Sequence, residues 1–312
     1  MFNREPILYS QSPPVKILSF LLIIFLSLLF TLTIGIAMGF LFYGGGMLDY
    51  IKEGLSLNDP SFLPMLRYLQ IINTLGIFVF PSLIFALLAS KSPARYLAIK
   101  LTPSFLSIVT GVAVIIAILP FIHWLAGFNE ILSLPECLAG VEEWMKRSEE
   151  QAKELTYMFL GTTTVAGLLI NLIMIAVLSA IGEEFLFRGV LLRLFREWTK
   201  NPHVAVLISA FLFSALHLQF YGFLPRLFLG IILGYLFIWT RSIWVPVLVH
   251  FVNNGIAVVA AWFYAKGNIQ HNFESVGEVD QPLVIISSLV IVLVMMLSIR
   301  FYEHKKKGST FG

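Results

Sequence analysis

Residues 155–188 read LTYMFLGTTTVAGLLINLIMIAVLSAIGEEFLFR, a long uncharged run that ends in two adjacent glutamates and an arginine. About 20 apolar residues suffice to cross a bilayer as a helix, so this run predicts a membrane-spanning helix. Ionisable groups at membrane depth cost about 2.5–3.5 kcal/mol each on insertion scales. Glu183, Glu184 and Arg188 therefore mark a candidate functional site.

The composition of the whole chain predicts the same class of protein. The 312 residues are 58% apolar and 12% charged, whereas soluble domains carry about 25% charged residues. We therefore expect an integral membrane protein with an all-α fold, a polytopic bundle of transmembrane helices. The net charge of +3 is spread over the loops, which gives no indication of a nucleic-acid partner. Because Cys137 is the single cysteine, an intrachain disulfide and a cysteine-based zinc site are not expected.

Charged residues divide the chain into apolar windows of transmembrane length. The windows predict about eight spans, near residues 17–43, 68–90, 104–127, 158–182, 203–220, 222–240, 242–264 and 281–300. We expect four parts in this order: N-terminal transmembrane helices (1–130), an amphipathic or loop segment (131–157), a helical core that holds the ionisable residues (158–265), and a last transmembrane helix with a basic tail (266–312).

The loop charges predict the orientation, because an excess of Lys and Arg marks cytoplasmic loops. Basic residues gather on alternate connections, among them Lys91, Arg95, Lys100, Lys200, Arg241 and Lys305 to Lys307. The other connections hold many acidic residues, among them Asp49, Glu53, Asp59, Glu142, Glu149, Glu274, Glu278 and Asp280. We therefore expect a multi-pass protein of the cell membrane, in contact with the lipid bilayer, with both termini in the cytoplasm.

The segment 136–157 has its own pattern. Apolar residues recur at helical spacing in its first part, at Cys137, Leu138, Val141, Trp144 and Met145, with charged residues between them. An amphipathic helix on the outer membrane surface and an ordinary solvated helix both fit this pattern.

Helix geometry separates the two adjacent glutamates. Glu184 and Arg188 are four residues apart, so on a helix they share a face and can pair. Glu183 is rotated by about 100° from Glu184 and is free to point elsewhere, where it can act as a general base. A helix end at the cytoplasmic interface, where the charges meet headgroups and water, fits the same three residues.

Two later spans each carry a pair of residues four apart, Phe213 with His217 and His250 with Asn254. Each pair shares a helix face, and hydrogen bonding between helices is the simplest role for such residues. Ionisable side chains within spans generally face the bundle interior, so these residues can converge with Glu183. A glutamate with a histidine can activate a water, and a histidine with an asparagine can donate to an oxyanion. Together they would make a hydrolytic site.

The order and spacing of the three motifs, Glu-Glu-x-x-x-Arg, Phe-x-x-x-His and His-x-x-x-Asn, resembles the CPBP family, also called the CAAX prenyl protease and bacteriocin-processing or Abi family. The resemblance covers about residues 160–260 and implies that 158–265 is the catalytic core of an intramembrane endopeptidase. It implies a glutamate protease whose substrate is a membrane-embedded or lipidated peptide or protein. The implied catalytic residues are Glu183 as general base, His217 as partner of the attacking water, and His250 with Asn254 as the oxyanion site; the implied supporting residues are Glu184, Arg188 and Phe213.

Metal dependence stays open at this point. The family is often labelled metalloprotease, but the sequence holds no H-E-x-x-H motif. We expect no cofactor, and the alternative is a zinc ion held by Glu183, His217 and His250.

Two other classes of function also fit intramembrane charges. The first is an ion- or proton-coupled transporter with Glu183, Arg226 and the histidines along its path, although no inverted repeat is evident. The second is a catalytically silent immunity or scaffold protein of the same fold.

If the helix that carries Glu183 and Glu184 continues to about Trp198, it is too long for one span. Either its cytoplasmic end protrudes, or the motif lies inside the membrane and is reached from the cytoplasmic side.

Overall fold

The computed structural model describes residues 5–48, 60–132, 134–269, 279 and 281–309. These residues form helices and contain no strand, so the predicted all-α bundle is confirmed. Within them, seven helices are long and apolar enough to cross a membrane: Pro13–Tyr43, Leu63–Ala89, Phe105–Glu130, Val165–Thr199, Phe220–Thr240, Trp244–Ala265 and Pro282–Lys306. Of the acidic residues used to predict orientation, Asp49, Glu53, Asp59, Glu274, Glu278 and Asp280 lie outside the described residues.

Several spans are built from more than one helical element. The elements of the first half are α1 (Pro13–Tyr43), η1 (Pro60–Phe62), α3 (Leu63–Thr74), the π-helical η2 (Leu75–Val79), α4 (Phe80–Ala89), α5 (Pro93–Tyr96), α6 (Phe105–Glu130), η3 (Glu136–Leu138) and α7 (Ala139–Leu160). The elements of the second half are α8 (Val165–Asn171), η4 (Leu172–Leu178), α9 (Ser179–Glu184), η5 (Phe185–Leu191), α10 (Leu192–Thr199), α11 (Pro202–Ala215), η6 (Phe220–Gly222), α12 (Phe223–Thr240), α13 (Trp244–Ala265) and α14 (Pro282–Ser309).

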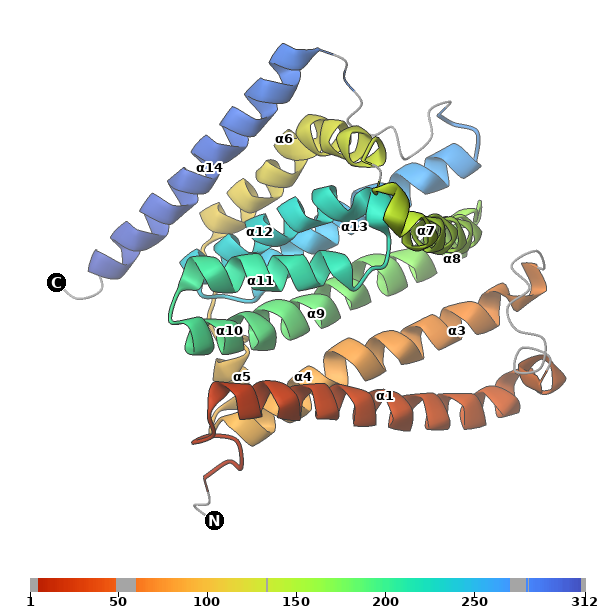
Figure 1. The fold of residues 1–312 in the computed structure, drawn as a ribbon, viewed down its shortest axis with the longest axis horizontal. Coiled ribbons are helices and arrows are strands. Elements are labelled where there is room, and N and C mark those ends of the chain that lie inside the picture. Colours follow the sequence, from red (N-terminus) through yellow and green to blue (C-terminus); the bar gives the residue numbers. More distant parts are fainter. Residues whose placement is uncertain (1–4, 49–59, 133, 270–278, 280, 310–312) are drawn as a thin grey trace.

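The bundle has a central group of helices with one group on each side (Figure 1). The continuous helix α8–α10 lies with α11, α12 and α13 at the centre, α6 and α14 cover one side, and α1, α3 and α4 cover the other. All motif residues therefore belong to the central group.

The fifth predicted span is shorter than expected. We predicted a span near 203–220, but α11 has 14 residues, Pro202–Ala215, or about 21 Å at 1.5 Å per residue. A hydrocarbon core is about 30 Å thick, so α11 alone does not cross it. Leu218 takes a left-handed conformation (φ 53°), and the chain turns back through η6 into α12.

Small residues bring α11 and α12 into close contact. A Cβ on Gly230 would lie 3.0 Å from the Ala210 Cβ, and one on Gly234 would lie 3.0 Å from a Val206 methyl. Such Gly-x-x-x-Gly spacing lets membrane helices approach closely and gain packing contacts. This close approach sets the position of the Phe213–His217 motif relative to α12.

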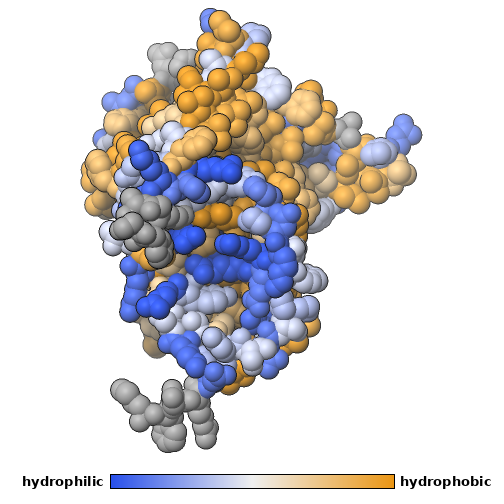
Figure 2. All heavy atoms as spheres, turned by 90° about the vertical axis from the view of Figure 1, so that its left-hand side faces the viewer, coloured by the Kyte–Doolittle hydropathy of each residue, from blue (hydrophilic) through white to orange (hydrophobic). Residues whose placement is uncertain are grey.

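The bundle has two distinct ends, which we call the N/C end and the α7 end. The N/C end holds the start of α1, the end of α14 and the short α10–α11 and α12–α13 connections, whereas α7 lies at the opposite end (Figure 1). Hydrophilic side chains gather on the N/C end (Figure 2), and its exposed basic residues include Lys91, Arg95, Lys100, Lys200 and Arg241. The basic connections predicted from the sequence thus lie together at one end.

Helix α7 begins close to the predicted amphipathic segment and ends at Leu160. Of its apolar stripe, Leu138, Val141 and Trp144 are exposed, while Trp144 also contacts the Phe220 ring at 5.3 Å between centroids. Glu149, one turn after Met145, is buried, and its Oε2 accepts a hydrogen bond from the Tyr221 N–H at 3.2 Å. Helix α7 therefore lies across the short α11–η6 turn.

The two ends predict opposite labelling of cysteines in intact cells. Cys137 is exposed at the α7 end, and if the basic N/C end is cytoplasmic, a membrane-impermeant maleimide should label Cys137 from outside. A cysteine introduced at the N/C end, Lys100→Cys in a Cys137→Ser background, should label only after permeabilisation. Labelling of Lys100→Cys but not Cys137 in intact cells would reverse the orientation.

Candidate active site

The first motif lies in the middle of the longest helix. Thr164 caps this helix, because its Oγ1 accepts a hydrogen bond from the Gly167 N–H at 3.0 Å, and Lys200 ends it in a left-handed conformation. The helix Val165–Thr199 has 35 residues, or about 52 Å at 1.5 Å per residue, so Glu183 lies about 25 Å from either end. The helix continues past Trp198 to Thr199, which is longer than one span requires.

Two π-helical segments flank the glutamates. η4 and η5 lie directly before and after the six-residue α9, which ends with Glu183 and Glu184. π-helical turns are rare and occur frequently at functional sites, because the wider turn re-aims the side chains that follow. The two π-helical segments thus point to a functional site at Glu183 and Glu184, which the hydropathy of the sequence does not indicate.

Glu184 and Arg188 form a buried ion pair. The Arg188 Nη1 donates to Glu184 Oε1 at 2.7 Å, and the two side chains are 1% and 0% exposed. Arg188 Nη2 also donates to the Gly230 carbonyl at 3.1 Å, and the guanidinium lies 4.8 Å from the centroid of the Phe213 ring. The i, i+4 spacing predicted this pair, whereas its contacts with α11 and α12 depend on the packing.

His250 lies between the two glutamates. Its Nδ1 is 2.9 Å from Glu184 Oε1, and its Nε2 is 3.9 Å from Glu183 Oε2. A carboxylate only accepts hydrogen bonds, so Nδ1 carries the proton in the contact with Glu184. The Nε2 nitrogen is therefore the one directed towards Glu183.

His217 is held in the same manner by the backbone. Its Nδ1 donates to the Phe213 carbonyl at 2.7 Å, and its Nε2 is 4.0 Å from Glu183 Oε2. The Phe213 ring makes edge contacts with both imidazoles, at 5.1 Å from His217 and 5.8 Å from His250. The aromatic residue of the second motif thus packs against both histidines and Arg188.

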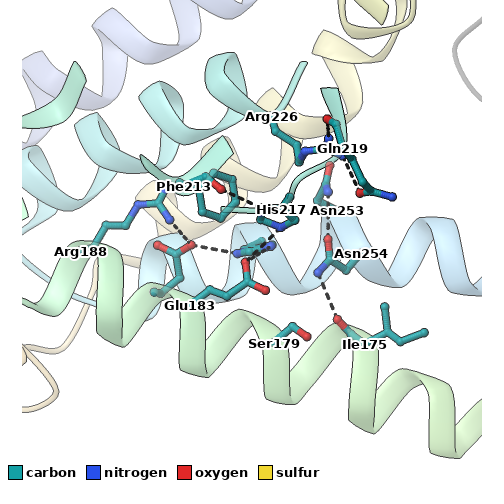
Figure 3. A network of polar contacts seen from close by, with 12 residues as sticks. Ile175, Ser179, Glu183, Arg188, Phe213, His217, Gln219, Arg226, Asn253 and Asn254 are labelled. Carbon is teal, nitrogen blue, oxygen red and sulfur yellow. Dashed lines mark hydrogen bonds and ion pairs between the residues drawn. The ribbon is translucent and has the colours of Figure 1, made fainter. Parts of the chain in front are cut away.

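Asn254 reaches the first motif helix through an amide contact. Its Nδ2 donates to the Ile175 carbonyl in η4 at 3.1 Å, and its Oδ1 accepts from Asn253 Nδ2 at 3.1 Å (Figure 3). An amide nitrogen has two N–H donors, so one remains beside the contact with Ile175. The structure therefore brings Glu183, His217, His250 and Asn254 to one place.

These four residues line a single cavity of about 590 Å³. The Glu183 side chain is 12% exposed and the His217 side chain 31% exposed, whereas Glu184 is fully buried. A ligand in the cavity can therefore contact Glu183 and His217 but not Glu184. Helix geometry predicted that Glu184 pairs with Arg188 while Glu183 points elsewhere, and these exposed fractions agree with that prediction.

The cavity wall includes polar residues outside the three motifs, among them Ser179, Gln219, Arg226 and Asn253. Arg226 donates through Nη1 to Gln219 Oε1 at 2.9 Å and through Nη2 to the Gln219 carbonyl, and its Nε–H has no hydrogen-bond partner. Gly222 leaves room for this guanidinium, which a Cβ would approach to 2.6 Å. In the sequence Arg226 was visible only as an intramembrane cation, and the other three carried no signal.

No group of three or more His, Cys, Asp or Glu side chains in the described ranges is arranged to hold a metal ion. Glu183, His217 and His250, the residues considered for zinc, have separations of 3.9 and 4.0 Å from Glu183 Oε2 to the two Nε2 atoms. The two Nε2 atoms nevertheless lie near the same carboxylate oxygen, Glu183 Oε2, which is buried and has no hydrogen-bond partner among the described residues.

Fold and site define a multi-pass α-helical membrane protein with an Rce1-like segment. The family Type II CAAX prenyl endopeptidase Rce1-like matches residues 165–256, which contain all three motifs. The resemblance to the CAAX protease family expected from these motifs is thereby confirmed over this segment.

Two curated relatives are similar to the same part of the chain. The membrane-embedded CAAX protease MroQ of Staphylococcus aureus (strain USA300) is 31% identical over 91 residues, which cover 27% of this chain and 36% of MroQ. The uncharacterized protein YpbD of Bacillus subtilis (strain 168) is 28% identical over 90 residues, 28% of this chain and 43% of YpbD. The matches thus span less than half of either relative. No solved structure matches the chain.

Arg188→Met should destabilise the fold strongly. Removing one partner of a buried ion pair leaves the other charge uncompensated and costs about 3–5 kcal/mol. We expect a large fall in the melting temperature of the detergent-purified protein. Arg196→Met, at an exposed position on the same helix, is the matched control and should change stability by less than about 0.5 kcal/mol. Equal melting temperatures for the two variants would contradict a structural role for Arg188.

Proposed function

We propose that the protein is an intramembrane endopeptidase that hydrolyses a membrane-associated peptide or protein with water activated by Glu183. One observation carries the proposal: Glu183 faces two imidazole Nε2 atoms, at 3.9 and 4.0 Å, in the wall of a cavity. These separations exceed a direct hydrogen bond, and a water between the groups can contact Glu183 and a histidine at once.

The first step uses Glu183 as general base. A water bound between Glu183 and His217 gives a proton to the Glu183 carboxylate, and its oxygen attacks the carbonyl carbon of the scissile bond. Glu183 then passes that proton to the leaving amide nitrogen as the C–N bond breaks. His217 holds the water through Nε2, because its Nδ1 is fixed by the Phe213 carbonyl.

The second step concerns the negative charge that develops on the carbonyl oxygen. We propose that His250 is then the imidazolium, with Nδ1–H on Glu184, and that its Nε2–H and the second N–H of Asn254 donate to this oxyanion. Glu184 orients His250 through Nδ1, and Arg188 in turn holds Glu184. Glu184, Arg188 and Phe213 thus act as supporting residues that keep the two histidines in place.

We propose that no metal takes part. A zinc ion on Glu183, His217 and His250 is the competing proposal, since histidines with occupied Nδ1 atoms often bind metals through Nε2. In that case zinc would activate the water. In both versions the Phe213 carbonyl and Glu184 hold the Nδ1 atoms of His217 and His250.

The substrate is proposed only as a class. The relative MroQ is named a CAAX protease, but the described cavity contains no feature that selects a prenyl group, so we propose a membrane-embedded or lipidated peptide or protein.

A proton or ion path through the bundle is the other candidate function. The residues on the N/C side of Glu183, Phe185 to Phe195, are mainly buried and packed in an apolar core, which disfavours a path through the bundle.

Glu183→Gln should abolish peptide cleavage, because glutamine keeps the size of the side chain but cannot accept the proton. The melting temperature should stay close to that of the parent protein, since Glu183 makes no ion pair shorter than 3.9 Å among the described residues. The measurement is a proteomic comparison of membranes from cells with either protein, supported by assays on purified samples. Full turnover by purified Glu183→Gln protein would end the general-base assignment.

Chelation separates the metal-free proposal from the zinc proposal. With Glu183 as base and no metal, prolonged dialysis against a strong chelator should leave the rate unchanged, and atomic absorption should detect no stoichiometric zinc. A lost activity that returns with zinc, and not with magnesium, would instead assign the three side chains as ligands.

A further inference from the structure

The cavity that contains Glu183 is closed towards the N/C end. On the N/C side of Glu184, the helix continues through η5 and α10, and its buried side chains Phe187, Val190 and Leu194 belong to one apolar cluster. The same cluster takes in Phe85 from α4 and Phe237 from α12, near the ends of those spans. Side chains at normal packing density leave few voids larger than a water molecule, so this apolar layer forms a seal between the cavity and the N/C end.

Towards the other end, the cavity extends to α7. Its lining includes Leu155, Phe159 and Leu160 on the last turns of α7, and Asn254, Ala257 and Val258 on the outer half of α13. The short helix α11 ends at Ala215 and does not reach this end of the bundle. Helix α7 therefore covers the space that a full-length span would have filled.

Hydrogen bonds attach α7 to the bundle at its C-terminal turn and in its middle. The Phe159 carbonyl accepts hydrogen bonds from Asn171 Nδ2 at 2.6 Å and from Arg67 Nη2 at 3.2 Å, which fix its C-terminal turn. Glu149 Oε2 accepts from the Tyr221 N–H at 3.2 Å, one backbone contact in the middle of the helix. The Phe159 carbonyl thus fixes the C-terminal turn of α7, and the Glu149 hydrogen bond and the Trp144–Phe220 contact lie nearer its middle.

The charge distribution places the two ends of the bundle on opposite sides of the membrane. Exposed basic residues gather at the N/C end, whereas α7 carries acidic residues beside its basic ones, including Glu142, Glu143 and Glu150. The excess of Lys and Arg places the N/C end in the cytoplasm. The end at which the cavity meets α7 is then extracytoplasmic. This differs from the cytoplasmic access expected from the sequence.

We infer that the active-site cavity is entered from the extracytoplasmic side, beneath α7, and that its substrate is a peptide segment lying at or already translocated to that side. Glu149 and its contact with Tyr221 hold α7 over the entrance. The biological meaning of this inference rests on the proposed peptidase function, but the sidedness of the cavity does not require any cleavage.

Cysteine accessibility tests the sidedness directly. Ser179 lines the cavity, and Ser179→Cys in a Cys137→Ser background puts a thiol there at nearly unchanged volume. We expect a charged, membrane-impermeant methanethiosulfonate to modify this thiol in right-side-out vesicles and not in inside-out vesicles. Modification is read as a mass increase of the purified protein.

Two matched cysteines calibrate the experiment. Ser209 is buried in α11, where its Oγ donates to the Phe187 carbonyl at 3.1 Å, so Ser209→Cys should resist the reagent in both vesicle types. Lys100→Cys is exposed at the N/C end and should react only in inside-out vesicles. Modification of Ser179→Cys from the same side as Lys100→Cys, or from neither side, would overturn the inference.

The cover is tested by releasing its central contact. Adding Glu149→Ala to Ser179→Cys removes one hydrogen bond of about 1 kcal/mol, which corresponds to an opening equilibrium about fivefold higher. The modification rate should rise by about that factor in right-side-out vesicles. Glu143→Ala, an exposed carboxylate on the same helix, should leave the rate unchanged. Equal rates for the two variants would remove α7 as the cover.

These readouts remain distinct from the test of the peptidase. A protein that shows the expected labelling but cleaves no peptide would contradict the proposed function and keep the sidedness. A protein that cleaves peptides through Glu183 while Ser179→Cys reacts from the cytoplasmic side would keep the function and overturn the sidedness.

Discussion

A guanidinium buried among membrane helices needs acceptors, and Arg188 is tied to three elements of the central group. It pairs with Glu184 on its own helix, donates to the Gly230 carbonyl of α12 and lies over the Phe213 ring of α11. Glu184 in turn holds His250 of α13. Since an uncompensated buried charge is costly, these contacts fix the relative positions of four helical segments.

The chemistry of the site follows from that constraint. Glu184 is occupied by Arg188 and His250, so Glu183 is the carboxylate left for the cavity. Both histidines have their Nδ1 atoms engaged and direct Nε2 towards Glu183. Hydrolysis by an activated water requires a base and its partners at fixed positions, and buried hydrogen bonds provide this orientation without any ordering at the moment of reaction.

The length of one helix links the site to its surroundings. Because α11 ends after 14 residues, His217 and Gln219 lie on a turn within the bundle rather than on an outer loop. Helix α7 covers that turn and brings Glu149 to the Tyr221 N–H. Helix α7, which carries charged residues along much of its length, thus forms part of the cavity wall, and its amphipathic pattern alone did not specify this role.

The sequence by itself determined the class of fold and the pairing within each helix. Apolar length dictates spans, and residues four apart share a face, so Glu184 with Arg188 and the convergence of Glu183 with His217, His250 and Asn254 could be predicted. Only the tertiary structure decided the contacts between helices: His250 between two carboxylates, Arg226 in the cavity wall and the seal on the N/C side. Those contacts depend on how closely α11 approaches α12 and where α11 stops, and packing rather than local periodicity sets both.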